Sequence, residues 1–530
     1  MTYDNGTLQK MFAANEAAIY DITSAANVQV AASGMHSGDW SYTQFATSGG
    51  VFLVAVNGVD PLQLYDGERW WPIGSGNVVQ LSIGSTSGTF EPGDAITGEA
   101  SDATGTILYI EKNTLYVTAT NDNAFKSGEV VKNQGSAATT LSGDGAVYWA
   151  GINSANAAIA KIETSQFSFV WSYMSRLFFI ERGSLNVWYL QIDSIGGNAT
   201  LFPMGGVFPQ GGALMLGSTW SLDNSNSGGL SEQCIMATDA GEVAVYQGVD
   251  PSIAETWGKV GLYRIDKPRG PRAFVRNGGD LLIATDTGLI PLTQAVNRSV
   301  NTLSAGAASY PIQDVWAQYV EERPDRTWQV IIWPENQMLA VAIPNEDSYQ
   351  PFFLVMNINT GAWARFTNWN AKSLCVFRNS LYFGSVNSKI VSAWQTGSDM
   401  GAPFAGVYAP LFTDLGGTAI AKIAKDVRVT LRGTYETTWQ VSMLYDYIVN
   451  VPPPPTPPVN SDTSVWNQAI WDESRWNASV QLRAQSGWTP VSGMGYALSP
   501  CLQISSGNLL PYDTEIMRLD LTYVGGMLLS

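Results

Sequence analysis

The chain has little of what metalloproteins and disulfide-stabilised proteins use. Of its 530 residues, one is a histidine, His36, and three are cysteines. Cys234, Cys375 and Cys501 lie far apart, and no Cys-x-x-Cys pair or Cys/His cluster occurs, which argues against a zinc site or a disulfide framework. An odd number of cysteines suits a protein made in a reducing cytoplasm.

The single histidine restricts the catalytic chemistry that the chain can carry. A Ser-His-Asp triad could be built only around His36, which has Ser37 and Asp39 beside it. Neighbours in sequence seldom point at one another productively, so we expect His36 to be a loop residue in a turn. No phosphate-binding glycine loop follows a predicted strand. We therefore predict no catalytic, cofactor-binding or metal-binding residues, no cofactor, and a protein that is not an enzyme.

Charge is scarce and mostly negative. Charged residues make up 14% of the chain, and 45 acidic residues against 28 lysines and arginines give a formal net charge of −17. This excludes a protein that grips nucleic acid with a broad basic surface, and it fits a soluble surface or a channel that must not hold polyanions. No apolar run approaches membrane-spanning length, and residues 1–6 lack the features of a secretory signal.

What the sequence does contain is glycine and aromatic residues in a β pattern. There are 52 glycines, 22 tyrosines, 19 tryptophans and 19 phenylalanines, which suits strands and interfaces. Apolar runs separated by turn residues fill the stretch 326–384, without helical spacing. The runs are 329–333, 338–343, 352–356, 363–366, 374–377 and 381–383. This pattern is typical of a propeller blade and the hairpin after it.

The same hairpin recurs along the chain. Two copies share the sequence Ala-Thr-Asp-x-Gly, at 237–241 and 284–288, which are 47 residues apart. About seven such units occur at blade-sized spacings, and a ring of them would bury a shared core. We predict an all-β fold with a β-propeller of about seven blades, within a range of six to eight. Stacked sandwich domains are the alternative, but the units run on without linkers.

Two segments interrupt the propeller pattern. Phe90-Glu-Pro-Gly93-Asp94 is echoed 35 residues later by Phe125-Lys-Ser-Gly128-Glu129, on either side of a hairpin at 106–120. We predict a small β-barrel or β-roll at 83–145, inserted into the second blade. The propeller then occupies 1–82 and 146–401.

The second segment, 402–530, is predicted to be a β-sandwich-like domain. Its expected strands are 424–430, 438–444, 480–483, 496–504 and 515–523. Within it, a Pro-rich arm at 451–478 leads from polyproline to Trp466, Trp471 and Trp476. The arm is a candidate partner-contact loop; the alternative is a loop whose tryptophans fold back onto the sandwich.

One cluster of positive residues stands out in this acidic chain. Lys267, Arg269, Arg272 and Arg276 put four positive charges in ten residues. They are the best candidate for a charged contact, with DNA phosphates or with an acidic neighbouring subunit. A solvated loop that joins two blades is equally compatible with the pattern.

Two groups of carboxylates could provide the pair that a glycosidase needs. They are Glu321, Glu322 and Asp325, and Asp472 with Glu473. The first group directly precedes a predicted strand and the second lies in the tryptophan-rich arm, so we expect charged turn residues. The acidic residues of the insert do not have the spacing of a calcium-binding loop.

Several phrases along the chain resemble a known family. They are 10–15 with 19–23, 57–61 with 65–67 and 70–72, and, most clearly, Asn357-Ile-Asn-Thr-Gly-Ala-Trp363-Ala-Arg-Phe366 with Leu381-Tyr-Phe-Gly384. These phrases look like those of the tail nozzle or tail-hub proteins of short-tailed bacteriophages, also called packaged-DNA stabilisation proteins. The resemblance covers most of the chain through loose structural phrases and not through a catalytic motif.

The resemblance implies a structural virion protein. Such proteins form a homohexameric ring, the nozzle, at the distal end of a short tail, below a dodecameric adaptor ring on the portal. The ring would line the channel that retains and then ejects the DNA genome, without sequence specificity. The insert, the sandwich and the Pro-rich arm would be candidates for contacts with the adaptor, tail fibres or the host surface. The protein would be made in the host cytoplasm and reside in the virion tail.

Two other functions stay open. A tail-associated glycan hydrolase predicts a carboxylate pair in an aromatic groove. A receptor-binding or glycan-binding propeller at the tail tip predicts aromatic pockets repeated in each blade. Trp70, Trp188, Trp257 and Trp363 recur roughly once per blade beside different neighbours, and we interpret them as blade packing.

Overall fold

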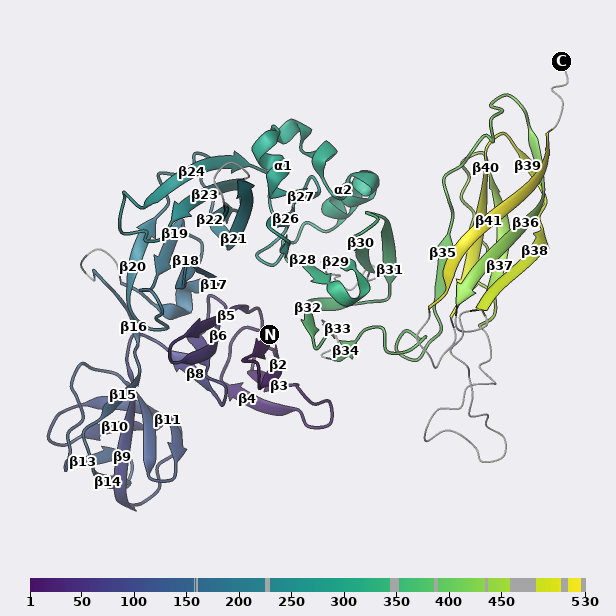
Figure 1. Cartoon of the computed structure of the whole chain (residues 1–530). Helices are drawn as coiled ribbons and strands as arrows, with labels where there is room; N and C mark the ends of the chain where they lie inside the picture. The colour runs from purple at the N-terminus through teal and green to yellow at the C-terminus, as the bar shows by residue number, and fades with distance from the viewer. Residues whose placement is uncertain are drawn as a thin grey trace, which may run out of the picture. The chain divides into compact units, whose positions relative to one another are not determined.

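The chain folds as strands in two units, residues 1–391 and 392–530 (Figure 1). The computed structural model describes residues 1–156, 158, 161–224, 229–343, 352–385, 389–433, 437–457, 483–506 and 513–525. Strands account for most of these residues, which confirms the predicted all-β class.

Apart from an inserted barrel, the described part of the first unit contains seven sheets in chain order. They are antiparallel except where β16 joins the third. The first sheet contains β1 (Thr2–Asp4), β2 (Gln9–Ala14), β3 (Ala18–Asp21) and β4 (Gln29–Ser33), and the second contains β5 (Ser41–Thr47), β6 (Gly50–Val56), β7 (Leu62–Tyr65) and β8 (Trp70–Ile73); the third contains β16 (Ile152–Ser154), β17 (Phe167–Tyr173), β18 (Arg176–Glu181), β19 (Asn186–Tyr189) and β20 (Gly197–Pro203). The fourth contains β21 (Leu214–Asn224), β22 (Gly229–Thr238), β23 (Glu242–Gly248) and β24 (Trp257–Arg264), and the fifth contains β25 (Phe274–Asn277), β26 (Asp280–Ala284) and β27 (Leu289–Pro291). The sixth contains β28 (Gln329–Trp333), β29 (Met338–Ile343), β30 (Phe352–Asn357) and β31 (Trp363–Thr367), and the seventh contains β32 (Ala371–Phe377), β33 (Ser380–Ser385) and β34 (Ile390–Ser392).

These sheets pack into a propeller-like ring. Each sheet contacts the next through its first strand: β1 lies beside β6, β5 beside β17, β17 beside β21, β21 beside β26, β25 beside β28, and β28 beside β32. The ring closes because β1 also lies beside β32. Arg378, which follows β32, donates a hydrogen bond to Gln9 Oε1 on β2 at 3.1 Å. Each large hydrophobic cluster of the ring joins neighbouring sheets, so no sheet has a core of its own.

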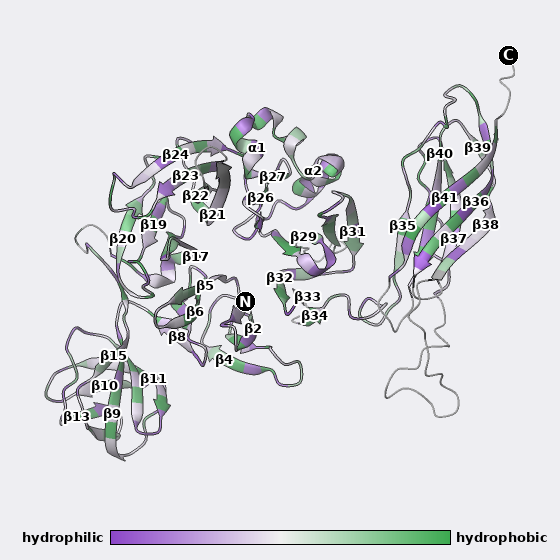
Figure 2. Cartoon of the chain, in the orientation of Figure 1, coloured by the Kyte–Doolittle hydropathy of each residue, from purple (hydrophilic) through white to green (hydrophobic). Residues whose placement is uncertain are grey.

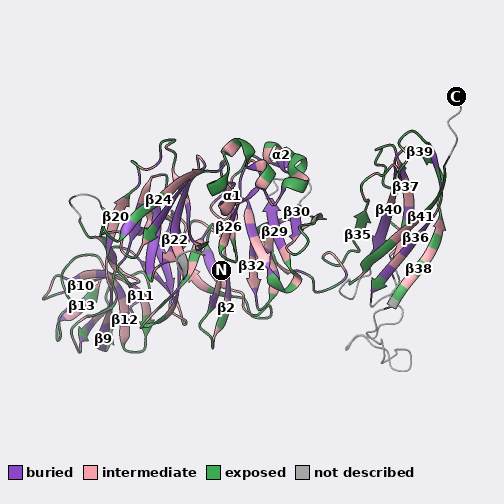
Figure 3. Ribbon diagram, turned by 45° about the horizontal axis from the view of Figure 1, so that its top comes forward, coloured by how far each residue is buried: buried purple, intermediate pink, exposed green. Residues whose placement is uncertain are grey.

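The hairpins predicted from the sequence are confirmed, and they occupy equivalent places in the ring. In six sheets a recurrent hairpin corresponds to two consecutive strands: β2–β3, β6–β7, β18–β19, β22–β23, β26–β27 and β33–β34. Some strands of these sheets are buried on both faces, as in β7 and most of β29, and their sequences are therefore largely apolar and lack the alternation of a half-exposed strand (Figure 3). Their turns require glycine at some positions: Gly241 has φ +87°, and a Cβ there would lie 2.6 Å from the carbonyl oxygen of Ile265.

A helical segment after the fifth sheet was not predicted. It contains α1 (Leu292–Asn297), the short 3-10 turns η2 (Val300–Thr302), η3 (Ser304–Gly306) and η4 (Tyr310–Ile312), and α2 (Gln313–Glu322). Trp316 of α2 is fully buried, donates from Nε1 to the carbonyl of Thr285 at 2.9 Å, and packs edge-on against Trp328. Tyr319 and Val320, three and four residues after Trp316, pack against the same core, so α2 presents one apolar face to the ring.

The inserted domain is a closed six-stranded barrel with a seventh strand beside it. It consists of β9 (Val78–Ser87), β10 (Ala95–Gly98), β11 (Thr104–Glu111), β12 (Thr114–Ala119), β13 (Val130–Asn133), β14 (Ala138–Leu141) and the added β15 (Ala146–Trp149). Pairing of β12 with β9 closes it. The barrel begins at Val78 and not at 83, and it follows the complete second sheet and does not interrupt it. Ile152 N–H donates to the Gly74 carbonyl at 2.8 Å, so its entry and exit are adjacent.

The echoed phrases of the barrel form equivalent turns. Glu91 N–H donates to the Asp94 carboxylate at 3.0 Å, and Lys126 N–H donates to the Glu129 carboxylate at 2.5 Å. Phe90 and Phe125, which open the two phrases, both lie in the barrel core. The acidic residues therefore close turns, as expected.

The second unit is a sandwich of two sheets. One contains β35 (Ala405–Tyr408), β40 (Leu498–Ser505) and β37 (Thr438–Tyr445); the other contains β38 (Arg483–Pro490), β36 (Lys422–Gly433), β39 (Met494–Gly495) and β41 (Glu515–Gly525). Polar and apolar residues alternate along β36 (Figure 2), and its inward side chains Val427, Val429 and Leu431 meet Leu502 and Ile504 of β40. The unit begins at Ser392, earlier than the predicted 402.

Candidate functional site

The predicted basic cluster lies in the connection between β24 and β25, and the structure divides it. Lys267 and Arg276 are exposed, Arg272 is partly buried, and Arg269 is only 2% exposed. The prediction that all four residues form one charged contact surface is therefore wrong for Arg269. Its guanidinium is directed into the protein, where partners distant in sequence surround it.

Arg269 joins the fifth sheet to the segment that precedes the sixth. Its Nη1 lies 3.0 Å from Asp286 Oδ1, and its Nη2 donates to the carbonyl oxygens of Arg323 and, at 2.9 Å, of Asp325. The guanidinium also lies 5.0 Å from the ring centre of Trp328. A planar group with five donors suits such a site, since it can bond several acceptors at once. Arg269 is therefore a structural residue.

Arg272 reaches a pocket on the inner side of the ring. Its Nη2 lies 2.6 Å from Asp39 Oδ1, in the segment before β5. The pocket has a volume of about 260 Å³ and lies where the first strands of the second to fourth sheets begin. We call it the axial pocket. It is lined by Asp39, Trp40, Ser41, Asn57, Ser168, Arg182, Gly183, Ala213, Leu214, Met215, Asp239, Pro271 and Arg272.

The axial pocket is lined by both polar and apolar side chains, and most of its charged groups already have partners. Asp39 neutralises Arg272, and Asp239 Oδ1 accepts a hydrogen bond from Ala213 N–H at 2.8 Å. Arg182 is exposed and forms no ion pair within the described residues. The volume of the axial pocket lies below the range of about 300–1,000 Å³ that is usual for small-molecule sites. The pocket can hold ordered water or a small polar group.

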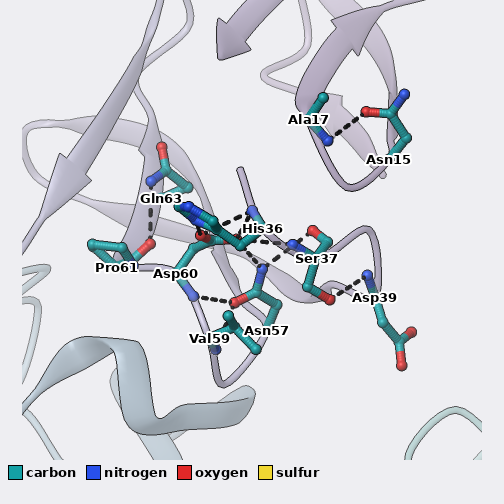
Figure 4. Close-up of polar contacts among 10 residues, drawn as sticks. All are labelled: Asn15, Ala17, His36, Ser37, Asp39, Asn57, Val59, Asp60, Pro61 and Gln63. Atoms are coloured by element: carbon teal, nitrogen blue, oxygen red, sulfur yellow. Dashed lines mark hydrogen bonds and ion pairs between the residues drawn. The ribbon is translucent and has the colours of Figure 1, made fainter. Parts of the chain in front are cut away.

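The loop that carries His36, just before the pocket residues Asp39 and Trp40, is organised by a buried carboxylate (Figure 4). Asp60 is 2% exposed and accepts hydrogen bonds from the backbone N–H groups of His36 and Ser37 and from Asn57 Nδ2, at 2.7–3.3 Å. The His36 Nδ1 lies 2.7 Å from Asp60 Oδ1. Burial alone would raise the pKa of Asp60, but the hydrogen bonds outweigh it and the pKa is lowered.

This arrangement differs from a catalytic triad. The ring of His36 faces Asp60, and the Ser37 hydroxyl accepts a hydrogen bond from Asp39 N–H at 3.2 Å. The expectation that His36 is a loop residue in a turn is confirmed. Sequence reasoning missed Asp60, although Asn57-Gly-Val-Asp60 carries a recognisable signal: Asn57 Oδ1 accepts from the N–H groups of Val59 and Asp60, which is an Asx turn.

The other candidate residues fall into three groups. Trp466, Trp471 and Trp476, together with Asp472 and Glu473, lie outside the described residues. Glu321 and Glu322 end α2 and Asp325 follows it, so the first carboxylate group belongs to the end of a helix. Trp70, Trp188 and Trp257 are buried, as expected for blade packing, whereas Trp363 is half-buried and donates from Nε1 to the carbonyl of Ala308 at 3.0 Å. In the part of the chain that the structure describes, no group of three or more metal-ligating side chains occurs.

The start of the Pro-rich arm lies against the sandwich. Gln503 Nε2 donates to the Pro452 carbonyl and Ser505 Oγ to the Pro455 carbonyl, both at 2.6 Å, and Thr438 Oγ1 donates to Thr456 O at 3.0 Å. Polyproline carbonyls are free to accept such bonds, because this conformation has no internal hydrogen bonds. The described part of the arm, up to Pro457, is thus a strap over β40 and does not project.

Comparison with known proteins gives structural likeness only. No family model and no curated protein matches the chain. Among solved structures, it resembles a proposed 6-phosphogluconolactonase of Bacteroides uniformis, with 11% identity over 67% of this chain and 95% of that one and a TM-score of 0.27. A proposed 6-phosphogluconolactonase of Bacteroides fragilis matches with 9% identity over 67% and 93%, also with a TM-score of 0.27.

These likenesses correct one expectation. Both matched proteins are described as enzymes, which overturns the prediction that the chain is not an enzyme, and we withdraw it. At this level of similarity the matches assign no activity to this chain. Among the described residues, no helix is long and apolar enough to cross a membrane.

Proposed function

We propose that this chain is a structural virion protein that forms the distal ring, or nozzle, of a short phage tail. The seven sheets of the first unit would be the seven blades of a β-propeller in the nozzle wall. Six copies would surround the channel that retains and then ejects the genome, below the adaptor ring, with tail fibres as further neighbours. The protein would be made in the host cytoplasm and reside in the virion.

The main support for this proposal is the position, within the fold, of the sequence segments that resemble the tail nozzle family. Residues 10–15 extend from β2, 57–61 form the turn between β6 and β7, 357–366 run from the end of β30 into β31, and 381–384 lie in β33. All of these segments lie in hairpins of the ring, and such hairpins recur from one sheet to the next. The phrases therefore describe one architecture and are not scattered over unrelated elements.

The charge distribution supports a channel that does not grip DNA. The chain has a net charge of −17, and two of the four residues of its densest positive cluster are paired with acids, Arg269 with Asp286 and Arg272 with Asp39. A protein that bound phosphates along its surface would need unpaired lysines and arginines there. An acidic wall repels DNA and lets it slide.

The genome channel would lie between subunits and not along the axis of one propeller. A sphere with the 260 Å³ volume of the axial pocket is roughly 8 Å across, whereas the major groove of duplex DNA alone is about 12 Å wide. The Asp39–Arg272 ion pair also closes the inner side of the ring. Each propeller would thus be a solid block in the wall, and neighbouring blocks would meet through heterologous contacts.

Imaging of the purified protein, alone and with its candidate adaptor, tests this proposal. We expect six-fold rings with a central opening, either directly or once the adaptor is added. A compact particle that ignores the adaptor would contradict the proposal. Binding or cleavage of host polysaccharide by such a particle would then favour the glycan-directed functions.

A further inference from the structure

Four charged side chains line the axial pocket, and they come from four consecutive sheets of the ring. In sheet order these are Asp39 before β5, Arg182 between β18 and β19, Asp239 between β22 and β23, and Arg272 before β25. Negative and positive groups therefore alternate from one sheet to the next, and the lining carries no net charge. A ligand with a single charge would meet two groups of its own sign. The lining suits a neutral polar ligand.

The charged groups leave both hydrogen-bond donors and acceptors for a ligand. Arg182 forms no ion pair among the described residues, so the N–H donors of its guanidinium are left for solvent or a ligand. Asp239 accepts a hydrogen bond from Ala213 N–H through Oδ1 at 2.8 Å, and its Oδ2 accepts none within the described part of the chain. The Asp39 side chain, paired with Arg272 through Oδ1, is still 59% exposed. The pocket thus combines groups that only donate with groups that only accept.

Two glycines allow Arg182 and Asp239 to lie close against backbone. A Cβ at Gly58 would lie 3.1 Å from Arg182 Cδ, so the arginine side chain lies directly on the turn between β6 and β7. A Cβ at Gly212 would lie 2.3 Å from Asp239 Oδ1. Both glycines have positive φ, +73° and +84°, which other residues rarely adopt. These contacts limit where the two charged groups can lie, so the pocket is largely formed before a ligand arrives.

Apolar side chains form much of the remaining wall of the pocket. Trp40 and Leu214 are buried, and Met215 and Pro271 are partly buried. Sites for small molecules usually combine such apolar surface with a few polar groups that fix the orientation of the ligand. The volume of about 260 Å³ restricts the ligand to a small molecule. We therefore expect a compact ligand that carries both C–H groups and polar groups.

A polyhydroxylated molecule is a neutral ligand that matches this lining. Each hydroxyl group both donates and accepts hydrogen bonds, so neighbouring hydroxyls can accept from Arg182 and donate to Asp239. Guanidinium and carboxylate groups each present two atoms side by side, which suits two adjacent hydroxyls. The C–H groups of the same molecule can pack against Leu214 and Met215. We propose that the axial pocket binds a neutral polyhydroxylated ligand of the size of one sugar ring.

Charged small ligands match the lining less well. A small anion would bind Arg182 but would meet the carboxylates of Asp39 and Asp239, and Arg272 is already neutralised. An amino acid would have to give up the hydration of two full charges, whereas hydroxyl groups cost much less to desolvate. The pocket spans four sheets, so it also differs from aromatic pockets repeated in each blade. Binding in this pocket would not depend on the assembly state, and it goes beyond the nozzle proposal.

Saturation-transfer NMR on the full-length protein tests this binding. The neutral probes are glucose, galactose, mannose, N-acetylglucosamine and inositol, and the charged probes are acetate and glycine. A single ring makes few contacts, so we expect saturable binding of at least one neutral probe with a Kd on the order of 1 mM. Its affinity should not change at raised salt, because the ligand has no charge to screen. Arg182→Ala should weaken the binding of that probe about tenfold or more, because a charged donor group is lost.

Arg276→Ala is the matched control, because Arg276 is also exposed and does not line the pocket. The control should bind the probe like the wild-type protein, and circular dichroism checks that both variants keep the fold. Three results would overturn the proposed binding: no saturable binding of any neutral probe, equal affinity of the Arg182 and Arg276 variants, or binding of acetate or glycine in preference to the neutral probes. The mass of the assembly, which tests the nozzle proposal, is measured separately from these outcomes.

Discussion

Replacing Arg269 by alanine should destabilise the first unit substantially. The side chain is 2% exposed and makes an ion pair with Asp286 and hydrogen bonds to two carbonyl oxygens. Removing one partner of a buried pair costs about 3–5 kcal/mol. Asp286 is 26% exposed and keeps Arg326 at 3.6 Å, so we expect the lower end, about 3 kcal/mol. In a unit that spans residues 1–391 that corresponds to a Tm lowered by roughly 4 °C.

Thermal unfolding followed by circular dichroism measures this effect, and Arg276→Ala provides the comparison. Arg276 belongs to the same sequence cluster, but it is exposed and forms no ion pair among the residues that the structure describes. Its replacement should change stability by less than about 0.5 kcal/mol. Equal Tm values for the two variants would refute the structural role of Arg269, and the four positive residues would again be candidates for one contact surface.

Three further predictions follow from the ring and its insert. Asp60→Asn should lower the free energy of unfolding, measured with urea at pH 7, by about 1–3 kcal/mol. The pKa of Asp60 is held below its ordinary 3.8 in the folded protein, so the ionised carboxylate stabilises the fold at pH values above 3.8. The stability difference between the variant and the wild type should therefore shrink as the pH falls through the lowered pKa of Asp60. Trp316→Ala should cost about 3–5 kcal/mol, measured in the same way, because a fully buried indole leaves a cavity. Replacing residues 78–149 by a short Gly/Ser linker should leave a folded ring, because Gly74 and Ile152 already share a hydrogen bond, but its Tm in circular dichroism should fall, because Trp71 of the ring loses its contacts with four aromatic rings of the insert, those of Tyr109, Tyr116, Tyr148 and Trp149.

The hairpins of the ring could be predicted because local sequence determines them. In these hairpins, apolar runs are bounded by turn residues that the backbone conformation requires, as at Gly58 between β6 and β7 and at Gly241 between β22 and β23. The first strands are harder to predict, since β1 and β25 are short and also pack against strands of neighbouring sheets. Closure of the ring by β1 and β32 joins the two ends of the first unit, and no local pattern reveals such a contact.

The helical segment and the burial of Arg269 were missed for the same physical reason. Trp316 holds α2 in place through Thr285 and Trp328, and Arg269 is stabilised by carbonyl oxygens of Arg323 and Asp325, more than fifty residues away. A run of arginines predicts a charged surface only if nothing in the fold covers it. The aspartate of the repeated Ala-Thr-Asp turn, Asp286, was the available sign that an acidic partner was near.

The boundaries of the insert and of the sandwich were predicted less well than their classes. The alternation along β36 and the duplicated Phe-x-x-Gly turns determine strand and turn types directly. Where a domain begins depends on which sheet a strand joins, and β9 pairs with β12, β14 and β15, all of which come later in the chain. The residues before β9 therefore do not show that this strand belongs to the barrel and not to the second sheet.

The mass of the assembly formed by the purified protein tests the central claim most directly. One chain is 57.2 kDa, so a six-membered ring is about 340 kDa. The account predicts that mass photometry finds this species for the protein alone or after addition of the adaptor ring. A single species at the mass of one chain under both conditions would contradict it.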